Sequence, residues 1–217
     1  MFAALVLAVV GLALALHDRS SSGTGLRGSG IAATQVRHVA PFRGVELAGG
    51  TNVNVSIGSV QRVVVHADSN LLGAVTTRVV AGRLVVGNTG SFSTRSQMEV
   101  DVTVPELDAL ALSGGGILDA RDVHAHTLAL TLSGGGIAQA TGTADALTVL
   151  LTGRGSAQLR GLVARDVQVR LTGAGLVSVD ATDSLDATLT GAGSILYDGN
   201  PSHVTKDVTG TGVIAPG

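Results

Sequence analysis

Cysteine and tryptophan are absent from this 217-residue chain, and aromatic residues make up only 2% of it. Without cysteine the protein has no disulfide framework, no thiolate nucleophile, no Cys-ligated zinc site and no lipidated cysteine. The only aromatic residues are Phe2, Phe42, Phe92 and Tyr197. Because large rings are so scarce, we expect a narrow core filled by Val, Leu, Ile and Ala.

Charged residues are also few, at 14% of the chain, and 14 Lys and Arg stand against 16 Asp and Glu, a formal net charge of −2. A nucleic-acid platform that works by bulk charge needs a cationic excess, so nucleic acid is not an expected partner. Hydrophobic residues reach 45% and the mean hydropathy is +0.43, values that exclude a disordered chain.

The chain begins with an uninterrupted apolar segment, residues 2–16. As a helix it is too short for the ~30 Å hydrocarbon core of a bilayer, but it suits the apolar region of a secretory signal. We interpret residues 1–16 as a signal peptide or N-terminal anchor, and the Ser- and Gly-rich residues 17–38 as a linker. A signal peptide and an N-terminal anchor both predict an exported protein, which is periplasmic, at the cell surface or secreted. Any membrane contact would be made through an uncleaved residue 1–16 segment.

Glycine is the abundant residue, with 31 copies, and much of it lies in a repeat. The motif Leu/Val-Ser/Thr-Gly-x-Gly occurs six times, and its first glycines are Gly114, Gly134, Gly153, Gly173, Gly191 and Gly210. The steps between them are 20, 19, 20, 18 and 19 residues. So constant a period indicates stacked repeats that each supply the same unit. We expect this turn column to be structural, with glycine required by positive φ or by close backbone approach.

Apolar residues alternate with period 2 on both sides of each turn. Leu128, Leu130 and Leu132 precede one turn, and Val177 and Val179 follow another. This alternation predicts short strands with one buried face. Two or three such strands separated by glycine turns occupy about 19 residues, which is one coil of a parallel β-helix, or β-solenoid.

We therefore predict an all-β fold: a parallel β-helix with repeats of about 19 residues that occupies residues 39–217. Residues 39–104 would form irregular coils and residues 105–217 the regular repeats. A single stack over this range would hold about nine coils. An antiparallel sandwich or barrel is the alternative, because turn signals every 8 to 12 residues also suit it.

Several segments, taken in order, resemble the bacterial GIN domain, a family of auto-transporter adhesin head domains. They are Phe42-Arg-Gly-Val-Glu-Leu, Asn70-Leu-Leu, Gly82-Arg-Leu-Val-Val, Val104-Pro-Glu-Leu-Asp-Ala-Leu-Ala-Leu-Ser-Gly114 and the Leu-Thr-Gly-x-Gly repeats. The resemblance covers roughly residues 39–215. It implies a β-helical, exported envelope protein with an adhesive role, and it supplies no ligand and no catalytic residues.

In a solenoid, residues at equal offsets in successive repeats form columns, so a functional site should show as a column of reactive groups. The most regular polar column is Ser113, Ser133, Thr152, Thr172, Thr190 and Thr209. Short hydroxyl side chains beside a turn commonly bond the local backbone, and no base stands next to these six. We interpret them as a structural ladder.

Acids and histidines offer two weaker candidates. Asp180 and Asp198 lie at the same offset in neighbouring repeats, and Asp183 is near them, so these three form the one candidate acid cluster for a polysaccharide lyase or hydrolase. His124 and His126 alternate and could share a metal, but the sequence indicates no third ligand. We predict no catalytic, cofactor-binding or metal site, and we interpret the histidines as solvated turn residues.

The leading hypothesis is a non-enzymatic, exported envelope protein that acts as an adhesion or interaction module, without a cofactor, for a protein or glycan ligand. A polysaccharide-active enzyme that uses the acid cluster and a mechanical envelope spacer are the alternatives. Lys206 and Pro216 lie in the last repeat at positions that are apolar in earlier repeats, and both residue types protect sheet edges. We therefore expect a capped C-terminal end and a monomer.

Overall fold

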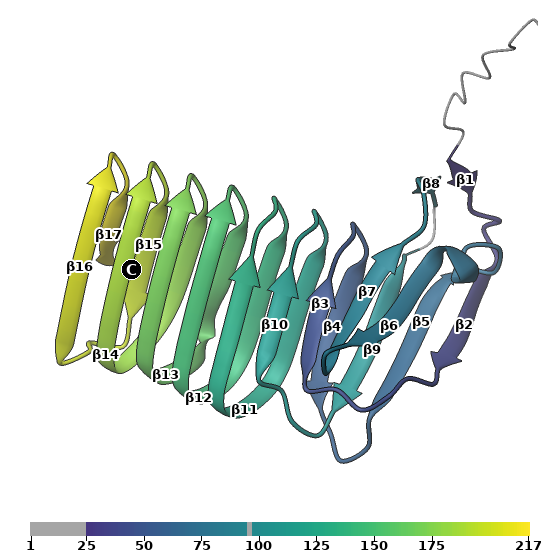
Figure 1. Cartoon of the computed structure of the whole chain (residues 1–217), viewed down its shortest axis with the longest axis horizontal. Coiled ribbons are helices and arrows are strands. Elements are labelled where there is room, and N and C mark those ends of the chain that lie inside the picture. Colours follow the sequence, from purple (N-terminus) through teal and green to yellow (C-terminus); the bar gives the residue numbers. More distant parts are fainter. Residues whose placement is uncertain (1–24, 95–96) are drawn as a thin grey trace, which may run out of the picture.

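The computed structural model describes residues 25–94 and 97–217, and in this part of the chain it contains strands, one 3-10 helix and no α-helix (Figure 1). The strands are β1 (Leu26–Arg27), β2 (Ala32–Arg37), β3 (Gly44–Leu47), β4 (Asn52–Ile57), β5 (Arg62–Asp68), β6 (Val75–Val80), β7 (Arg83–Asn88), β8 (Phe92–Ser93), β9 (Glu99–Val104), β10 (Ala109–Leu112), β11 (Ile117–Leu132), β12 (Ile137–Gly153), β13 (Ser156–Gly173), β14 (Leu176–Gly191), β15 (Ser194–Asp198), β16 (His203–Gly210) and β17 (Val213–Pro216). The 3-10 helix, η1, spans Leu72–Ala74. The all-β prediction is confirmed.

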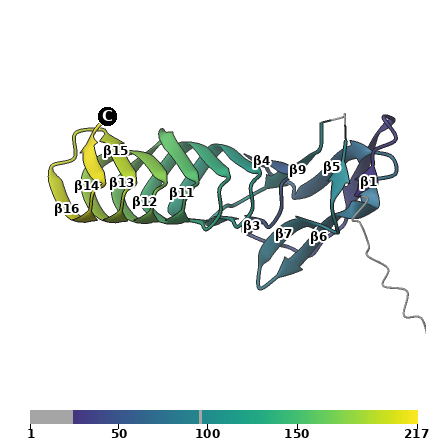
Figure 2. The same cartoon turned by 90° about the horizontal axis from the view of Figure 1, so that it is seen from above.

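A parallel stack forms the C-terminal part of the molecule, and its coils follow one another along the long axis (Figures 1 and 2). Cross-strand partners differ by the predicted period: Leu132 pairs with Leu151, Leu151 with Leu171 and Leu171 with Leu189. The fold is a β-solenoid of about five turns with a spacing of about 20 residues. This register confirms the parallel β-helix over the antiparallel alternative for the repeats.

Each long strand of the stack bends midway and so contributes to two sheets. In β11 the first part, Ile117–Arg121, pairs with β4, and the end, from Ala129 onward, pairs with β10. The pairing shifts register at the bend, between Ala120 and Val123. Each coil is therefore flattened, with a glycine turn at one edge and a bend at the other.

We call the two sheets the groove face and the opposite face. The groove face contains β2, β5, β9, β4, the first halves of β11 to β14, then β15 and β17. The opposite face contains β6, β7, β3, β10, the second halves of β11 to β14, and β16. The core lies between them.

The core consists of rows of aliphatic side chains, one from each coil. The row Leu132, Leu151, Leu171 and Leu189 is fully buried, with no exposed surface on any member. Burying a leucine side chain contributes roughly 1.5–3 kcal/mol, so each row adds stability in proportion to the number of coils. Small and branched residues fill this narrow space, as the scarcity of aromatics predicts.

The N-terminal half departs from the expected single stack of nine coils. Three pairs of neighbouring strands are antiparallel: β2 with β5, β5 with β9, and β6 with β7. The coil made by β3 and β4 lies between later strands, because β3 pairs with both β7 and β10, and β4 with both β9 and β11. The nine-coil expectation is wrong because sequence order and spatial order differ here.

The linker interpretation of residues 17–38 is wrong for its second half. β1 pairs with β8, and β2 adds antiparallel to β5 at the edge of the groove face. Most residues of β2 are exposed, so the strand is held by backbone pairing and carries no buried alternation that a sequence pattern could reveal. The predicted signal or anchor, residues 1–16, lies outside the described residues. Within the described ranges no helix is long and apolar enough to cross a membrane.

The glycine column follows the turns as predicted, for two different reasons. Gly153, Gly173, Gly191 and Gly210 have φ between +118° and +124°. Gly114 and Gly134 do not have positive φ, but a Cβ on either would overlap the backbone of the preceding coil. Close approach between coils is therefore the requirement that all six share.

The last coil is formed by β16 and β17. All eight residues of β16 are exposed, and Val208 keeps 43% of its surface. Lys206 pairs with the buried Ala187, and its ammonium group lies 4.5 Å from the centre of the Tyr197 ring. A charged side chain thus stands at a position of the last described coil that is apolar and buried in the preceding coil, which is a feature that disfavours strand addition.

Replacing Gly173 by Val should destabilise the fold far more than replacing its neighbour Ala174 by Val. A Cβ at Gly173 would lie 2.5 Å from the carbonyl oxygen of Gly153, in a backbone conformation that L-residues rarely adopt, whereas Ala174 is exposed. We expect a loss of about 3 kcal/mol for Gly173→Val and less than about 1 kcal/mol for Ala174→Val in urea unfolding. Equal losses would contradict this account of the turn.

Removing residues 203–217 should convert a monodisperse monomer into aggregates or head-to-tail assemblies, because it exposes the uncapped edge of β14. Light scattering checks this. Lys206→Val in the full chain should also promote self-association. Thr205→Val, at the adjacent position of β16, serves as the matched control. A monodisperse truncation, or a full-length dimer formed through Val208 and Ile214, would contradict the capping function.

Candidate functional site

A shallow groove of about 630 Å³ lies on the groove face, across the first halves of β11 to β14. Its walls and floor come from five successive coils, and the lining residues that matter here are Asp119, Arg121, Gln139, Gln158, Arg160 and Ser178. We call this the polar groove.

Four of these residues form a single row along the solenoid axis. Asp119 pairs with Gln139, Gln139 with Gln158, and Gln158 with Ser178. Toward the N-terminus the row continues through Asn54, which pairs with Asp119, and Asp101, which pairs with Asn54. Six adjacent strands therefore carry a polar side chain at the same register position.

This row was not predicted from the sequence, although the sequence contains a signal for it. Asp119, Gln139, Gln158 and Ser178 each lie five residues after the first glycine of their repeat. The residue type changes from coil to coil while the hydrogen-bonding character persists, so a search for identical residues overlooks it. Position within the repeat was the informative quantity.

Hydrogen bonds within the row hold its side chains in place. The Gln139 Nε2 donates to Gln158 Oε1 at 2.9 Å, and Asn54 Nδ2 donates to Asp101 Oδ1 at 2.9 Å. The side chain of Asp119 is only 14% exposed. A row fixed in this way loses less side-chain entropy when a ligand binds.

Two arginines flank the row, and each is paired with a carboxylate. Arg121 donates from Nε and Nη2 to Asp119 Oδ2 at 2.9 and 2.7 Å, and these contacts raise the pKa of Arg121 above its usual value. Arg160 Nε lies 3.1 Å from Asp198 Oδ2. Because each positive charge has a nearby negative partner, the groove has no excess of either sign.

An apolar strip, interrupted by Ser156, runs parallel to the polar row, two residues earlier on the same strands. Ile117 pairs with Ile137, Ile137 with Ser156, and Ser156 with Leu176. Ile117 and Leu176 each expose 38% of their surface. The groove face therefore offers a line of hydrogen-bonding groups beside a strip that is apolar in three of these four coils.

The predicted acid cluster is only partly brought together. Asp180 and Asp198 are cross-strand partners on β14 and β15. Asp198 is engaged by Arg160, Asp183 accepts a hydrogen bond from Ser202, and the buried Oδ1 of Asp180 has no hydrogen-bond partner. Among the described residues no group of three His, Cys, Asp or Glu side chains could hold a metal ion.

The hydroxyl column is in register as predicted, and its six residues are exposed. The expected bonds from these hydroxyls to the local backbone are not found in the described part of the chain. His124 contacts Thr143 at 3.0 Å, and His126, with a side chain 99% exposed, contacts Asp145 at 2.8 Å.

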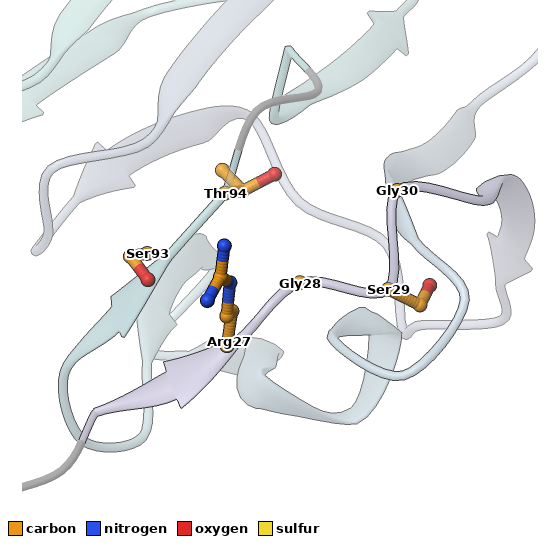
Figure 3. Close-up of a pocket in the computed structure, with 6 residues that line it drawn as sticks. All are labelled: Arg27, Gly28, Ser29, Gly30, Ser93 and Thr94. Carbon is orange, nitrogen blue, oxygen red and sulfur yellow. The ribbon is translucent and has the colours of Figure 1, made fainter.

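A second cavity, of about 230 Å³, lies where the N-terminal segment meets β8. Figure 3 shows Arg27, Gly28, Ser29 and Gly30 on one segment, with Ser93 and Thr94 on the other. The contacts there include a 2.6 Å hydrogen bond from Thr94 Oγ1 to the buried Asp68 Oδ2. This cavity belongs to the packing of β1 against β8 and is smaller than the polar groove.

Comparison with known proteins identifies related folds. A family model described as "Putative auto-transporter adhesin, head GIN domain" matches residues 41–201. A solved structure of a "putative adhesin" from Bacteroides fragilis NCTC 9343 has a TM-score of 0.73 at 20% identity, over 88% of this chain and 100% of that chain. A "putative adhesin" from Parabacteroides distasonis ATCC 8503 has a TM-score of 0.58 at 20% identity, over 89% of this chain and 100% of that chain.

A "Putative lipid binding protein" from Parabacteroides distasonis ATCC 8503 has a TM-score of 0.55 at 18% identity, over 88% of this chain and 99% of that chain. At identities this low the likeness is one of fold. No curated protein matches the chain.

Replacing Asp198 by Asn should lower the free energy of unfolding by less than about 1 kcal/mol, because its ion pair with Arg160 is between two partly exposed side chains. Urea unfolding of Asp198→Asn and Arg160→Met measures the effect. A loss of several kcal/mol for either variant would show that the pair is a structural element of the C-terminal coils.

Proposed function

Since this chain belongs to the GIN domain family described for auto-transporter adhesin heads, we propose that it is an exported envelope protein that acts as a non-enzymatic adhesion or interaction module. Family membership confirms the resemblance found in the sequence. The adhesive role and the export of this particular chain are the proposal.

The observation that carries the proposal is the polar row of the groove face. Six adjacent strands carry hydrogen-bonding side chains in one line, and a groove of about 630 Å³ lies over its C-terminal part. An extended, shallow surface of this kind suits recognition of a long ligand that lies along it.

The rigidity of the stack supports the same role. Each coil is bonded to its neighbours by parallel backbone pairing, and the rows between the sheets are fully buried. A rigid surface binds without the entropy cost of ordering loops. Solenoids characteristically use such extended surfaces for binding.

The enzyme alternative requires a working group of carboxylates. Asp198 is paired with Arg160, and Asp183 accepts a hydrogen bond from Ser202, so two of the three acids of the candidate cluster are engaged by separate partners and only Asp180 is not. Export is supported by the apolar residues 2–16 and by the adhesin descriptions of the family and of the similar structures.

The purified chain should bind saturably to at least one member of a panel of cell-surface polysaccharides and extracellular-matrix proteins in surface plasmon resonance. Reducing-end and lyase assays on the same polysaccharides, with and without added Ca²⁺, should show no cleavage. Because the side chains of the groove supply the contacts without a metal ion, adding a chelator should leave the binding affinity unchanged.

Two results would overturn the proposal. Metal-dependent cleavage that Asp198→Ala abolishes would establish the enzyme alternative. A mechanical spacer would be established if the chain binds no member of the panel and deletion of its gene affects only the integrity of the envelope.

A further inference from the structure

We propose that the polar groove binds an extended, uncharged oligosaccharide that runs along the solenoid axis. This inference rests on the proposed adhesive function and names the chemical class of its ligand.

The first argument is the chemistry of the row. Gln139 and Gln158 offer both donors and acceptors and Asp119 offers acceptors, while Ser178, only 7% exposed, ends the row with a largely covered hydroxyl. A sugar hydroxyl is likewise both donor and acceptor, so neighbouring hydroxyls on a ring can be satisfied by an amide or a carboxylate. The internal Gln139–Gln158 hydrogen bond holds these groups in line before the ligand arrives.

The second argument is spacing. Successive strands of a sheet lie about 4.8 Å apart, so the row presents one hydrogen-bonding group at each such step. This interval is close to the length that one ring adds to an extended polysaccharide. A ligand with one ring over each coil would therefore meet an equivalent contact at every ring.

The third argument is the apolar strip beside the row. Leu176 lines the groove itself, and Ile117 and Ile137 stand beside it two residues from the polar positions, with Ser156 between Ile137 and Leu176. A sugar ring has C–H groups on its faces and hydroxyls at its rim, so it can contact both lines together. Aliphatic side chains supply the contact surface that aromatic platforms supply in other sites, and the affinity of a single groove should accordingly be modest.

Charge and backbone pairing argue against other occupants. Arg121 and Arg160 are each paired with a carboxylate, so an anionic ligand finds no unpaired cation among the groove's two arginines. The strands under the groove are bonded on both sides, which leaves no free edge for a peptide to add as a strand.

Titration with neutral β-1,4-linked hexasaccharides of glucose, N-acetylglucosamine and mannose tests the proposal. The side-chain amide NMR signals of Gln139 and Gln158 should shift with at least one of them. The double variant Gln139→Leu/Gln158→Leu should weaken that binding at least tenfold. Gln168→Leu, on the opposite face of the same β13 strand, is the matched control and should bind normally. Melting temperatures verify that all variants fold.

The proposal is overturned if no neutral hexasaccharide shifts the two amides, if the double variant binds as well as the control, or if hexagalacturonate binds more tightly than every neutral sugar. If the unmodified chain still binds a surface of the polysaccharide and matrix-protein panel while the hexasaccharides fail, the ligand class is wrong and the adhesive function stands. If neither binds, both proposals fail.

Discussion

At the glycine turns the backbones of successive coils lie so close that a side chain has little or no room, and the parallel pairing that continues through these turns fixes the spacing on which the rest of the structure depends. The amide of Ala174 donates to the carbonyl of Gly153 at 3.0 Å, and that of Ala192 donates to Gly173 at 2.9 Å. A Cβ at Gly173 would lie 2.5 Å from the carbonyl oxygen of Gly153, and a Cβ at Gly191 would lie 2.3 Å from that of Gly173, so neither position has room for a side chain. Glycine therefore allows the parallel register to continue through the turn without interruption.

Once the turns are in register, every other position of the repeat is placed in a row. Inward positions give lines of leucine, valine, alanine and isoleucine, and outward positions give lines in which the residue type varies from coil to coil. The inward rows are constrained to be apolar because both sheets pack on them. Outward rows have no such constraint, and the continuous polar character of the line from Asp101 to Ser178 therefore points to function.

The fold of residues 105–217 could be predicted because its information is local and repeated. The first glycines alone gave the period, and the alternation around them gave the buried faces. The N-terminal half could not be predicted in the same way. Its strands are joined by backbone pairing between distant segments, and β3 lies beside strands from later in the chain on both of its sides. The exposed β2 shows the same limit, because nothing in its pattern distinguishes it from a linker.

Sequence by itself therefore determined the repeat, the turn glycines and the apolar rows, since each depends on contacts repeated at a fixed separation of about 19 residues. Only the tertiary structure decided which outward residues share a row beside a groove, which acids have partners and where the stack changes to antiparallel pairing. These features depend on register shifts at the bends, such as that between Gln139 and Thr141. A one- or two-residue shift there changes which side chains become neighbours, and no periodicity in the chain records it.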